Sequence, residues 1–231
     1  MRIKINLSKS SSNLPINNQH LVNSFIHRCL SKNNEYHDTL SNYCVSNIRG
    51  CKLNSDTKTL MLINPFIIVS TNDMDFLNKL LCGISSNFVF TQDVNVIGFE
   101  FLNEELSDGF NLFKTLTPIL LRENIGNGKK RTITVFDDDF IPKLKQCIIR
   151  KLKSIDNNID LSNFDIKLGE KSIKKTKLEY VKNISSVGSL CDLVVYSNKN
   201  IADMIYNCGI GQSTGSGFGT IYEYKNHKLY Y

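Results

Sequence analysis

The stretch Gly209-Ile-Gly-Gln-Ser-Thr-Gly-Ser-Gly-Phe-Gly219 holds five of the thirteen glycines of this 231-residue chain within eleven residues. Glycine reaches positive φ without strain and lets a backbone lie directly against a neighbour or a ligand. Successive backbone N–H groups in such a loop can bind a phosphate. A helix-like segment, residues 198–208, precedes the loop, and an alternating, strand-like segment, residues 218–224, follows it. The predicted order is therefore helix, glycine loop, strand.

This order separates the loop from the common nucleotide-binding loops, which follow a strand and open a helix. Thr214 occupies the position of the third glycine of Gly-x-Gly-x-x-Gly, and no Lys-Ser/Thr pair follows. A nucleotide-binding α/β enzyme is therefore the least favoured interpretation. A helix C-cap with a loose turn is the structural alternative, although Gly209 alone would satisfy it.

Composition limits the class of protein. A hydrophobic content of 41% is enough for a packed core, and no apolar run is long enough to span a bilayer. The N-terminus has no apolar signal segment, so we expect a cytoplasmic protein without a membrane partner. The seven cysteines are scattered, with no Cys-x-x-Cys pair. This pattern argues against zinc and against disulfides, and it predicts buried thiols in a reducing compartment.

The net charge of +6 is concentrated in one segment. Residues 143–182 hold eleven Lys/Arg against five Asp/Glu, and the rest of the chain is balanced. The segment includes Lys171-Ser-Ile-Lys-Lys-Thr-Lys177, with Lys174, Lys175 and Lys177 close together. A localised basic strip is typical of a protein that binds a polyanion. An ordinary solvated lysine-rich surface is the alternative.

Hydrophobic periodicity predicts the element order β-α-β-β-α-β in the first half, which is the ferredoxin-like unit. The helices are expected to begin at Asn17/Asn18 and at Thr71/Asn72, which can act as caps. The expected strands cover residues 2–7, 43–53, 59–70 and 88–101.

The second half can be divided in the same way, with an additional hairpin through Gly126-Asn-Gly128. Its expected strands cover residues 115–121, 164–180, 187–196 and 218–224, and its expected helices cover 140–152 and 198–208. We therefore predict an α+β fold of two tandem ferredoxin-like (βαββαβ) domains, over residues 1–108 and 109–231. No residue-level repeat relates the halves, so the element order alone supports a duplication.

The glycine loop after a short helix resembles that of a known family, the CRISPR-associated repeat-RNA endoribonucleases (the Cas six family of the RAMP superfamily). Thr117-Pro-Ile-Leu-Leu is similar to the start of the family's second domain. Residues 36–52 are similar to its catalytic region, which is more variable. The resemblance spans essentially the whole chain, and it too implies two tandem ferredoxin-like domains.

The resemblance implies an endoribonuclease that cuts CRISPR precursor transcripts within the repeat, with no metal and no cofactor. In that family the 2′-hydroxyl attacks the adjacent phosphate and leaves a 2′,3′-cyclic phosphate and a 5′-hydroxyl. This chemistry needs a base, an acid, a cation and an in-line geometry. The implied partner is CRISPR repeat RNA, single-stranded or stem-loop, with CRISPR effector subunits as further partners. Whether the protein is a monomer or a homodimer stays open.

Among the four histidines, two are candidates for acid/base catalysis near neutral pH. His37 is the first, because it lies in an expected loop after the first helix, in the neighbourhood where the family carries its histidine. His27 is the second, on the polar edge of the first helix, where some relatives place a catalytic Tyr or His. Either could instead be a surface histidine without function.

The resemblance assigns further roles. Lys52 matches a position where a lysine stabilises the phosphorane, and Ser46 stands where some relatives have their histidine. This departure leaves the identity of the base open between His37 and His27, and Ser46 completes the candidate catalytic set. Lys174, Lys175 and Lys177 would follow the RNA backbone. The glycines of the loop are expected to position phosphates through backbone N–H groups; they are Gly209, Gly211, Gly215, Gly217 and Gly219.

A non-catalytic RAMP subunit that holds guide RNA is the alternative function. It would share the fold, the basic strip and the glycine loop, and would lack a working base. Alanine substitution of His27 and of His37 distinguishes the two.

Overall fold

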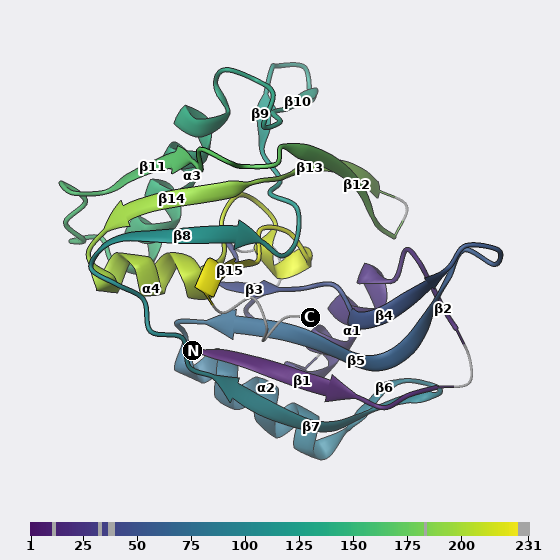
Figure 1. The fold of residues 1–231 in the computed structure, drawn as a ribbon. Coiled ribbons are helices and arrows are strands. Elements are labelled where there is room, and N and C mark those ends of the chain that lie inside the picture. Colours follow the sequence, from purple (N-terminus) through teal and green to yellow (C-terminus); the bar gives the residue numbers. More distant parts are fainter. Residues whose placement is uncertain (11–12, 32–33, 37–39, 183, 226–231) are drawn as a thin grey trace.

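The computed structural model describes residues 1–10, 13–31, 34–36, 40–182 and 184–225 (Figure 1). Over these residues the protein is an α+β structure with four α-helices and antiparallel sheets. No helix among the described residues is long and apolar enough to cross a membrane. His37 lies outside the described residues, as does His227.

The first half is built on one large antiparallel sheet. Its central strand, β1 (Arg2–Leu7), lies between β5 (Thr59–Thr71) and β7 (Val94–Leu102). Four shorter strands extend the two sides, three of them on β5 and the last on β7: β2 (Leu14–Pro15), β3 (Tyr43–Val45), β4 (Arg49–Asn54) and β6 (Val89–Thr91). Along this sheet the strand order is β3/β4-β5-β1-β7.

Two helices, α1 (Gln19–Cys29) and α2 (Met74–Ser86), cover one face of this sheet. Ile3, Ile5 and Leu7 of β1 point into that layer and are buried with the apolar sides of both helices. The predicted alternation of β1 and the predicted periodicity of α1 are therefore confirmed.

The second half has a four-stranded antiparallel sheet in the order β11-β14-β8-β15. Its strands are β8 (Gly109–Thr115), β11 (Asp165–Leu168), β14 (Asp192–Ser197) and β15 (Ile221–Glu223). The helices α3 (Phe140–Ile155) and α4 (Lys199–Cys208) contribute to its hydrophobic core.

Two hairpins project from this half (Figure 1). One pairs β9 (Arg122–Asn124) with β10 (Lys130–Thr132), as the Gly126-Asn-Gly128 sequence predicts. The other pairs β12 (Lys175–Val181) with β13 (Ile184–Leu190) and carries Lys175 and Lys177 of the basic segment, whereas the cations of residues 143–153 lie on α3.

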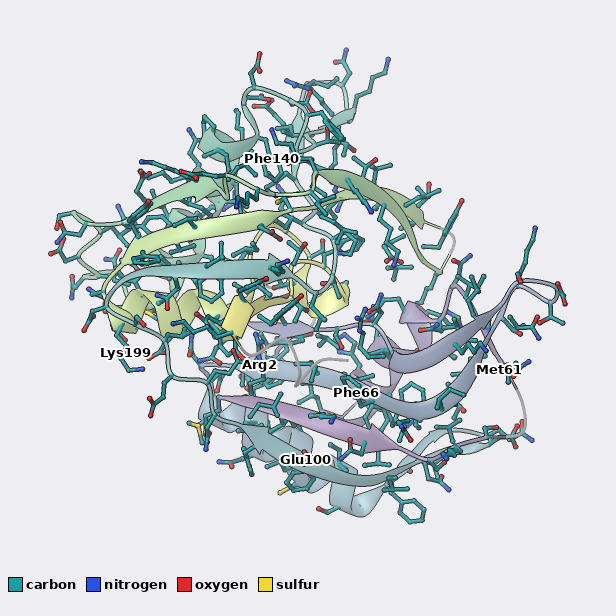
Figure 2. The ribbon with its side chains drawn as sticks, in the orientation of Figure 1. Arg2, Met61, Phe66, Glu100, Phe140 and Lys199 are labelled. Atoms are coloured by element: carbon teal, nitrogen blue, oxygen red, sulfur yellow. The ribbon has the colours of Figure 1, made fainter. Side chains whose placement is uncertain are left out.

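The halves are joined by polar and apolar contacts. A small apolar cluster combines Phe66 and Ile68 of β5 with Leu116 and Tyr222. Arg2, buried between the two sheets (Figure 2), donates from Nη1 to the carbonyl of Ile221 at 2.6 Å and from Nη2 to that of Tyr206 at 2.5 Å. A boundary between residues 108 and 109 stays a prediction.

Several predicted elements differ from the structure. The strand expected over residues 43–53 is two strands, β3 and β4, which residues 46–48 separate. Gly50, at φ +68°, lies inside β4 at an irregularity in the pairing with β5. The strand expected over 115–121 lies earlier, at β8. The cap of α2 is Asp73, whose carboxylate accepts from the N–H groups of Asp75 and Phe76, and not Thr71/Asn72.

The expectation of buried thiols holds for five cysteines and is wrong for two. Cys82 is exposed on α2, and Cys51 on β4 is half-buried. Burial raises the pKa of the Cys51 thiol to about 11, so this thiol is protonated at neutral pH.

Candidate nucleic-acid interface and active site

The glycine loop leaves α4 and folds back over the segment of residues 117–121. Gly209, at φ +69°, ends the helix. The N–H of Ile210 donates to the carbonyl of Gly219 at 2.9 Å, and the N–H of Gly219 donates to Pro118 at 2.9 Å. The N–H of Gln212 donates to Leu120 at 2.8 Å. The loop is therefore fixed by its own backbone and by the chain beneath it.

The other side of the loop packs against the first half. A Cβ on Gly215 would lie 2.6 Å from Cζ of Tyr43, and one on Gly209 would lie 2.8 Å from Cβ of Cys44. A Cβ on Gly217 would meet the amide of Gln19, at the start of α1. These glycines thus allow the loop to approach β3 and α1 more closely than any other residue would.

A buried lysine holds the loop from below. Lys151 of α3 is 5% exposed, and its Nζ donates to the carbonyl of Cys208 at 3.0 Å and to Oγ1 of Thr214 at 2.9 Å. The Thr214 hydroxyl donates in turn to the carbonyl of Tyr43 at 2.8 Å. Burial lowers the pKa of Lys151. This chain of hydrogen bonds connects α3, the glycine loop and β3.

The burial of the loop bears on its expected role. Within the loop only Gln212, Ser213 and Ser216 are half-buried rather than buried. Five of its backbone N–H groups, those of residues 210, 212, 216, 217 and 219, donate to carbonyls of the chain. Close packing therefore accounts for the glycines: Gly209, Gly215 and Gly217 pack against the first half, and Gly211 and Gly219 pack within the second half. Phosphate binding by the loop stays a prediction.

A cleft of about 470 Å³ lies between the two halves. Residues 16–19 at the start of α1 and residues 47–51 around β4 line one side, and residues 177–179 of β12 line the other. The cleft thus brings Lys177 to Arg49 and to the segment that precedes Lys52. The amides of Asn17, Asn18, Gln19 and Asn47 give it further polar groups.

Lys174, Lys175 and Lys177 are all exposed, at or on β12. Lys177 forms an ion pair with Glu179 at 2.5 Å, which reduces its free charge, whereas no ion pair is seen for Lys174 or Lys175 within the described part of the chain. An exposed hairpin with lysines beside a cleft between the two halves is suited to the phosphates of a nucleic acid.

The candidate catalytic residues have different surroundings. His27 is half-buried on α1, and Lys52 is exposed on β4. Ser46 is fully buried, its Oγ accepting from the N–H of Ile68 at 2.9 Å and donating to the carbonyl of Asn47 at 2.8 Å. The hydroxyl of Ser46 therefore stabilises the junction after β3, and it is not presented to a substrate. The placement of His37 is outside the described residues.

A second basic pocket, of about 330 Å³, lies between the β9–β10 hairpin and α3 and was not predicted. Arg122, Arg150 and Lys143 line it, together with Gln212 of the glycine loop. The Gln212 amide accepts from the backbone N–H of Arg122 at 3.1 Å and donates to its carbonyl at 2.9 Å. Because Gln212 and Arg122 are 90 residues apart in the chain, no local sequence pattern predicts that they meet in this pocket.

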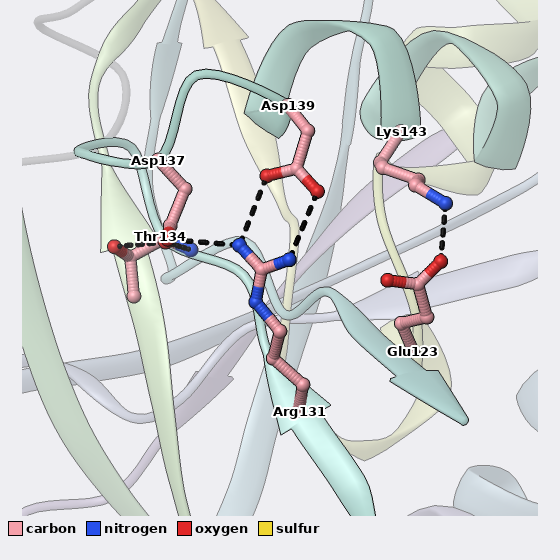
Figure 3. Close-up of polar contacts among 6 residues, drawn as sticks. All are labelled: Glu123, Arg131, Thr134, Asp137, Asp139 and Lys143. Carbon is pink, nitrogen blue, oxygen red and sulfur yellow. Dashed lines mark hydrogen bonds and ion pairs between the residues drawn. The ribbon is translucent and has the colours of Figure 1, made fainter. Parts of the chain in front are cut away.

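Ion pairs connect the β9–β10 hairpin to α3 and to the residues just before it (Figure 3). Lys143 contacts Glu123, and Arg131 makes a two-point contact with Asp139, at 3.2 Å for each N–O pair. Arg131 also donates to Asp137 at 3.1 Å. Of the cationic residues here, Arg122 and Arg150 are therefore better placed than Lys143 or Arg131 to bind an added anion.

Within the described chain, no group of three or more His, Cys, Asp or Glu side chains is arranged to hold a metal ion.

Residues 102–222, more than half of the chain, match the family model of the C-terminal part of the CRISPR-associated protein Cas6. The chain belongs to the Cas6 family. The match covers β8 to β15 and so includes the basic hairpin and the glycine loop.

Individual relatives agree with this assignment. The chain is 24% identical over 181 residues to a CRISPR-associated endoribonuclease-like protein Cas6 of Pyrococcus furiosus, covering 75% of this chain and 70% of that protein. A solved Cas6-related protein of P. furiosus superposes with a TM-score of 0.84 at 21% identity, over 98% of this chain and 99% of the other. A RAMP protein described as binding different RNA substrates superposes with a TM-score of 0.80 at 22% identity, over 96% and 99%. These structural likenesses establish a Cas6-like fold.

Proposed function

We propose that this protein is a metal-independent endoribonuclease of the cytoplasm that cleaves CRISPR precursor transcripts within the repeat. The 2′-hydroxyl before the scissile bond attacks the adjacent phosphate, and the products carry a 2′,3′-cyclic phosphate and a 5′-hydroxyl. The observation that carries the proposal is the cleft between the halves, where Lys177 of the basic hairpin faces the segment before Lys52. Membership of the Cas6 family supplies the RNA substrate class.

Three side chains form the proposed catalytic set. His37 is the base that removes the 2′-hydroxyl proton, and His27 is the second candidate for this role. Lys52 is exposed and free to approach a phosphate, where it stabilises the developing negative charge. Ser46 is left out of this set, because its hydroxyl is buried and bonded within the chain.

The binding surface is proposed to run from Lys174, Lys175 and Lys177 into the cleft. Lysines on a hairpin bind phosphates with a strong salt dependence and little sequence preference. The glycine loop supports this surface by holding the two halves together. Only those backbone N–H groups of the loop that do not donate to a carbonyl of the chain could contact a phosphate directly.

The two halves are proposed to be ferredoxin-like domains. In the first half the order of the principal strands is β3/β4-β5-β1-β7, and in the second half it is β11-β14-β8-β15. Numbered by their succession in each half, both orders read 2-3-1-4 with a helix after the first and third strands, as in a βαββαβ unit. This shared order supports the duplication that the sequence suggests.

A guide-holding subunit without nuclease activity is the second candidate. The burial of Ser46, where some relatives have a catalytic histidine, favours it. So does the printed description of a structural relative as a RAMP protein that binds different RNA substrates. Both candidates require RNA binding, and only the first requires a base.

Analysis of the product ends tests the proposal. The protein is incubated in EDTA with RNA that carries the host repeat, and the fragments are identified by mass spectrometry. We expect one cut, with a 2′,3′-cyclic phosphate on the upstream fragment and a 5′-hydroxyl on the downstream fragment. Tight binding without a cut would support the guide-holding subunit, and cleavage that requires a divalent metal would refute the proposed chemistry.

A further inference from the structure

Lys151 is a buried cation without an acidic partner. Its side chain leaves α3 beneath the glycine loop and is 5% exposed. Burial lowers the pKa of Lys151, and the other groups that shift it are the thiols of Cys44, Cys147 and Cys208 and the guanidinium of Arg150. No carboxylate of the described chain forms an ion pair with it. An apolar side chain would fill this position at a lower desolvation cost, so the ammonium needs an explanation beyond packing.

The ammonium donates to two separate points of the glycine loop. It reaches the carbonyl of Cys208, the last residue of α4, at 3.0 Å, and Oγ1 of Thr214 at 2.9 Å. The last carbonyls of a helix have no partner within the helix, and the negative end of the helix dipole favours a cation. The lysine therefore fixes the end of α4 relative to the turn of the loop, Thr214–Ser216.

The charge of Lys151 also decides the direction of the Thr214 hydroxyl. An ammonium has three donors and no acceptor, and a hydroxyl has a single proton to donate. Because Oγ1 of Thr214 accepts from the ammonium, its own proton points to the first half, where the carbonyl of Tyr43 lies at 2.8 Å and that of Ser41 at 3.5 Å. An apolar side chain at position 151 would leave the hydroxyl without a fixed orientation.

The turn that Lys151 holds packs against the elements on which the candidate site is built. A Cβ on Gly215 would lie 2.7 Å from the hydroxyl oxygen of Tyr43 on β3, and one on Gly217 would meet the amide of Gln19 at the start of α1. The helix α1 also carries the candidate base His27, and its first turn lines the cleft. A shift of the turn would therefore move α1 and β3 relative to the second half.

We propose that Lys151 is a positioning residue for RNA cleavage, which acts through Thr214 to hold the glycine-loop turn against β3 and α1. The inference rests on the proposed nuclease function and adds a buried residue of the second half that does not touch the RNA. Loss of the ammonium is expected to slow the chemical step at unchanged RNA affinity, because a misplacement of reacting groups by about 1 Å costs about 10²-fold in rate.

Two substitutions of Thr214 separate the hydrogen bond from packing. Thr214→Val keeps the volume and loses the hydroxyl, whereas Thr214→Ser keeps the hydroxyl and loses a methyl group. In single-turnover cleavage with saturating protein, Thr214→Val is expected to be about 10–100-fold slower than wild type, and Thr214→Ser is expected to stay close to it. The opposite order would assign the effect to packing and would overturn the proposal.

Lys151→Met should show the same loss of rate as Thr214→Val. The double variant should be no slower than the slower single variant, because both substitutions break one chain of hydrogen bonds. Lys153→Met is the matched control, since Lys153 is exposed on the same helix, and it should keep the wild-type rate. Losses that multiply in the double variant would contradict the relay, as would a loss of affinity for RNA with a 2′-deoxy nucleotide at the cut.

Hydrogen exchange of the free protein tests the positioning without RNA. Thr214→Val and Lys151→Met should both speed the exchange of backbone N–H groups over residues 41–46 and 214–217, and Lys153→Met should not. A wild type that does not cleave RNA would refute the proposed nuclease function, whereas this measurement would still decide whether Lys151 holds the turn. Unchanged exchange in Thr214→Val would overturn the inference even where Lys151→Met fails to fold.

Discussion

The variant Gly219→Ala tests the claim that the glycine loop is a packing device. Gly219 has φ +66°, and a Cβ there would lie 1.7 Å from the carbonyl oxygen of Ile210. The same two residues are joined by the hydrogen bond from the N–H of Ile210 to the carbonyl of Gly219. An alanine therefore both strains the backbone and forces the end of the loop away from Ile210 at its start.

The expected loss of stability has three parts. A left-handed conformation costs an L-residue about 1–2 kcal/mol, and loss of the hydrogen bond costs about 1 kcal/mol. Displacing a tightly packed neighbour costs about 1–3 kcal/mol. The free energy of unfolding should therefore fall by about 3–6 kcal/mol, which is a large part of the stability of an ordinary domain.

The matched control is Gly128→Ala in the β9–β10 hairpin. Gly128 has a similar φ of +71°, and a Cβ there would meet nothing within 4 Å. Only the backbone strain of about 1–2 kcal/mol applies. Urea denaturation of both variants gives the comparison. Equal losses in the two variants would show that the contact between residues 210 and 219 does not hold the loop, and would refute the reasoning.

Three further predictions concern catalysis, binding and pH. His37→Ala should lower the single-turnover cleavage rate by about 10²–10⁴-fold at unchanged RNA affinity, with His27→Ala as the comparison; an unchanged rate in both would exclude both candidate bases. The double variant Lys175→Ala/Lys177→Ala should lower the slope of the logarithm of the RNA-binding constant against the logarithm of the salt concentration by about 1–2 in magnitude; an unchanged slope would show that RNA does not bind along β12. Hydrogen bonds from a neighbouring threonine hold the pKa of Asp137 below its ordinary value, so its contribution to stability is complete above about pH 4 and is lost as the pH falls through the lowered pKa. The unfolding free energies of wild type and Asp137→Asn should therefore differ at neutral pH and converge in acid; curves that stay parallel would contradict this.

The sequence predicts the elements whose side chains alternate cleanly between core and solvent. β1 and α3 are of this kind, with apolar residues at the spacing of a strand and of a helix. The strand predicted over residues 115–121 begins six residues earlier, at Gly109. The prediction is wrong because two residues of β8 depart from the usual pattern of apolar residues inside and polar residues outside. Phe110 points to solvent, and Asn111 points inward, where its amide both accepts from and donates to the backbone of Ser107 at 2.8 Å. Asparagine is typical of turns, so the sequence alone does not indicate that Asn111 lies buried within a strand.

The candidate site is predictable only in part, because it is made by contacts between distant segments. The Thr214 hydroxyl and the carbonyl of Tyr43 are 171 residues apart in the chain and 2.8 Å apart in space. No local pattern shows that the glycine loop would meet β3, so an exposed phosphate loop was the natural expectation. Likewise, the charge count identified the basic strip, but only the fold shows that Lys177 faces the cleft and Arg49.

A matched pair of RNAs tests the central claim most directly. One carries the host's CRISPR repeat, and the other has a single 2′-deoxy nucleotide immediately before the cut; both are incubated with the protein in EDTA. The account predicts one defined cut in the first RNA, none in the second, and equal binding of both. Equal cleavage of the two RNAs, or binding of both with no cleavage, would contradict it.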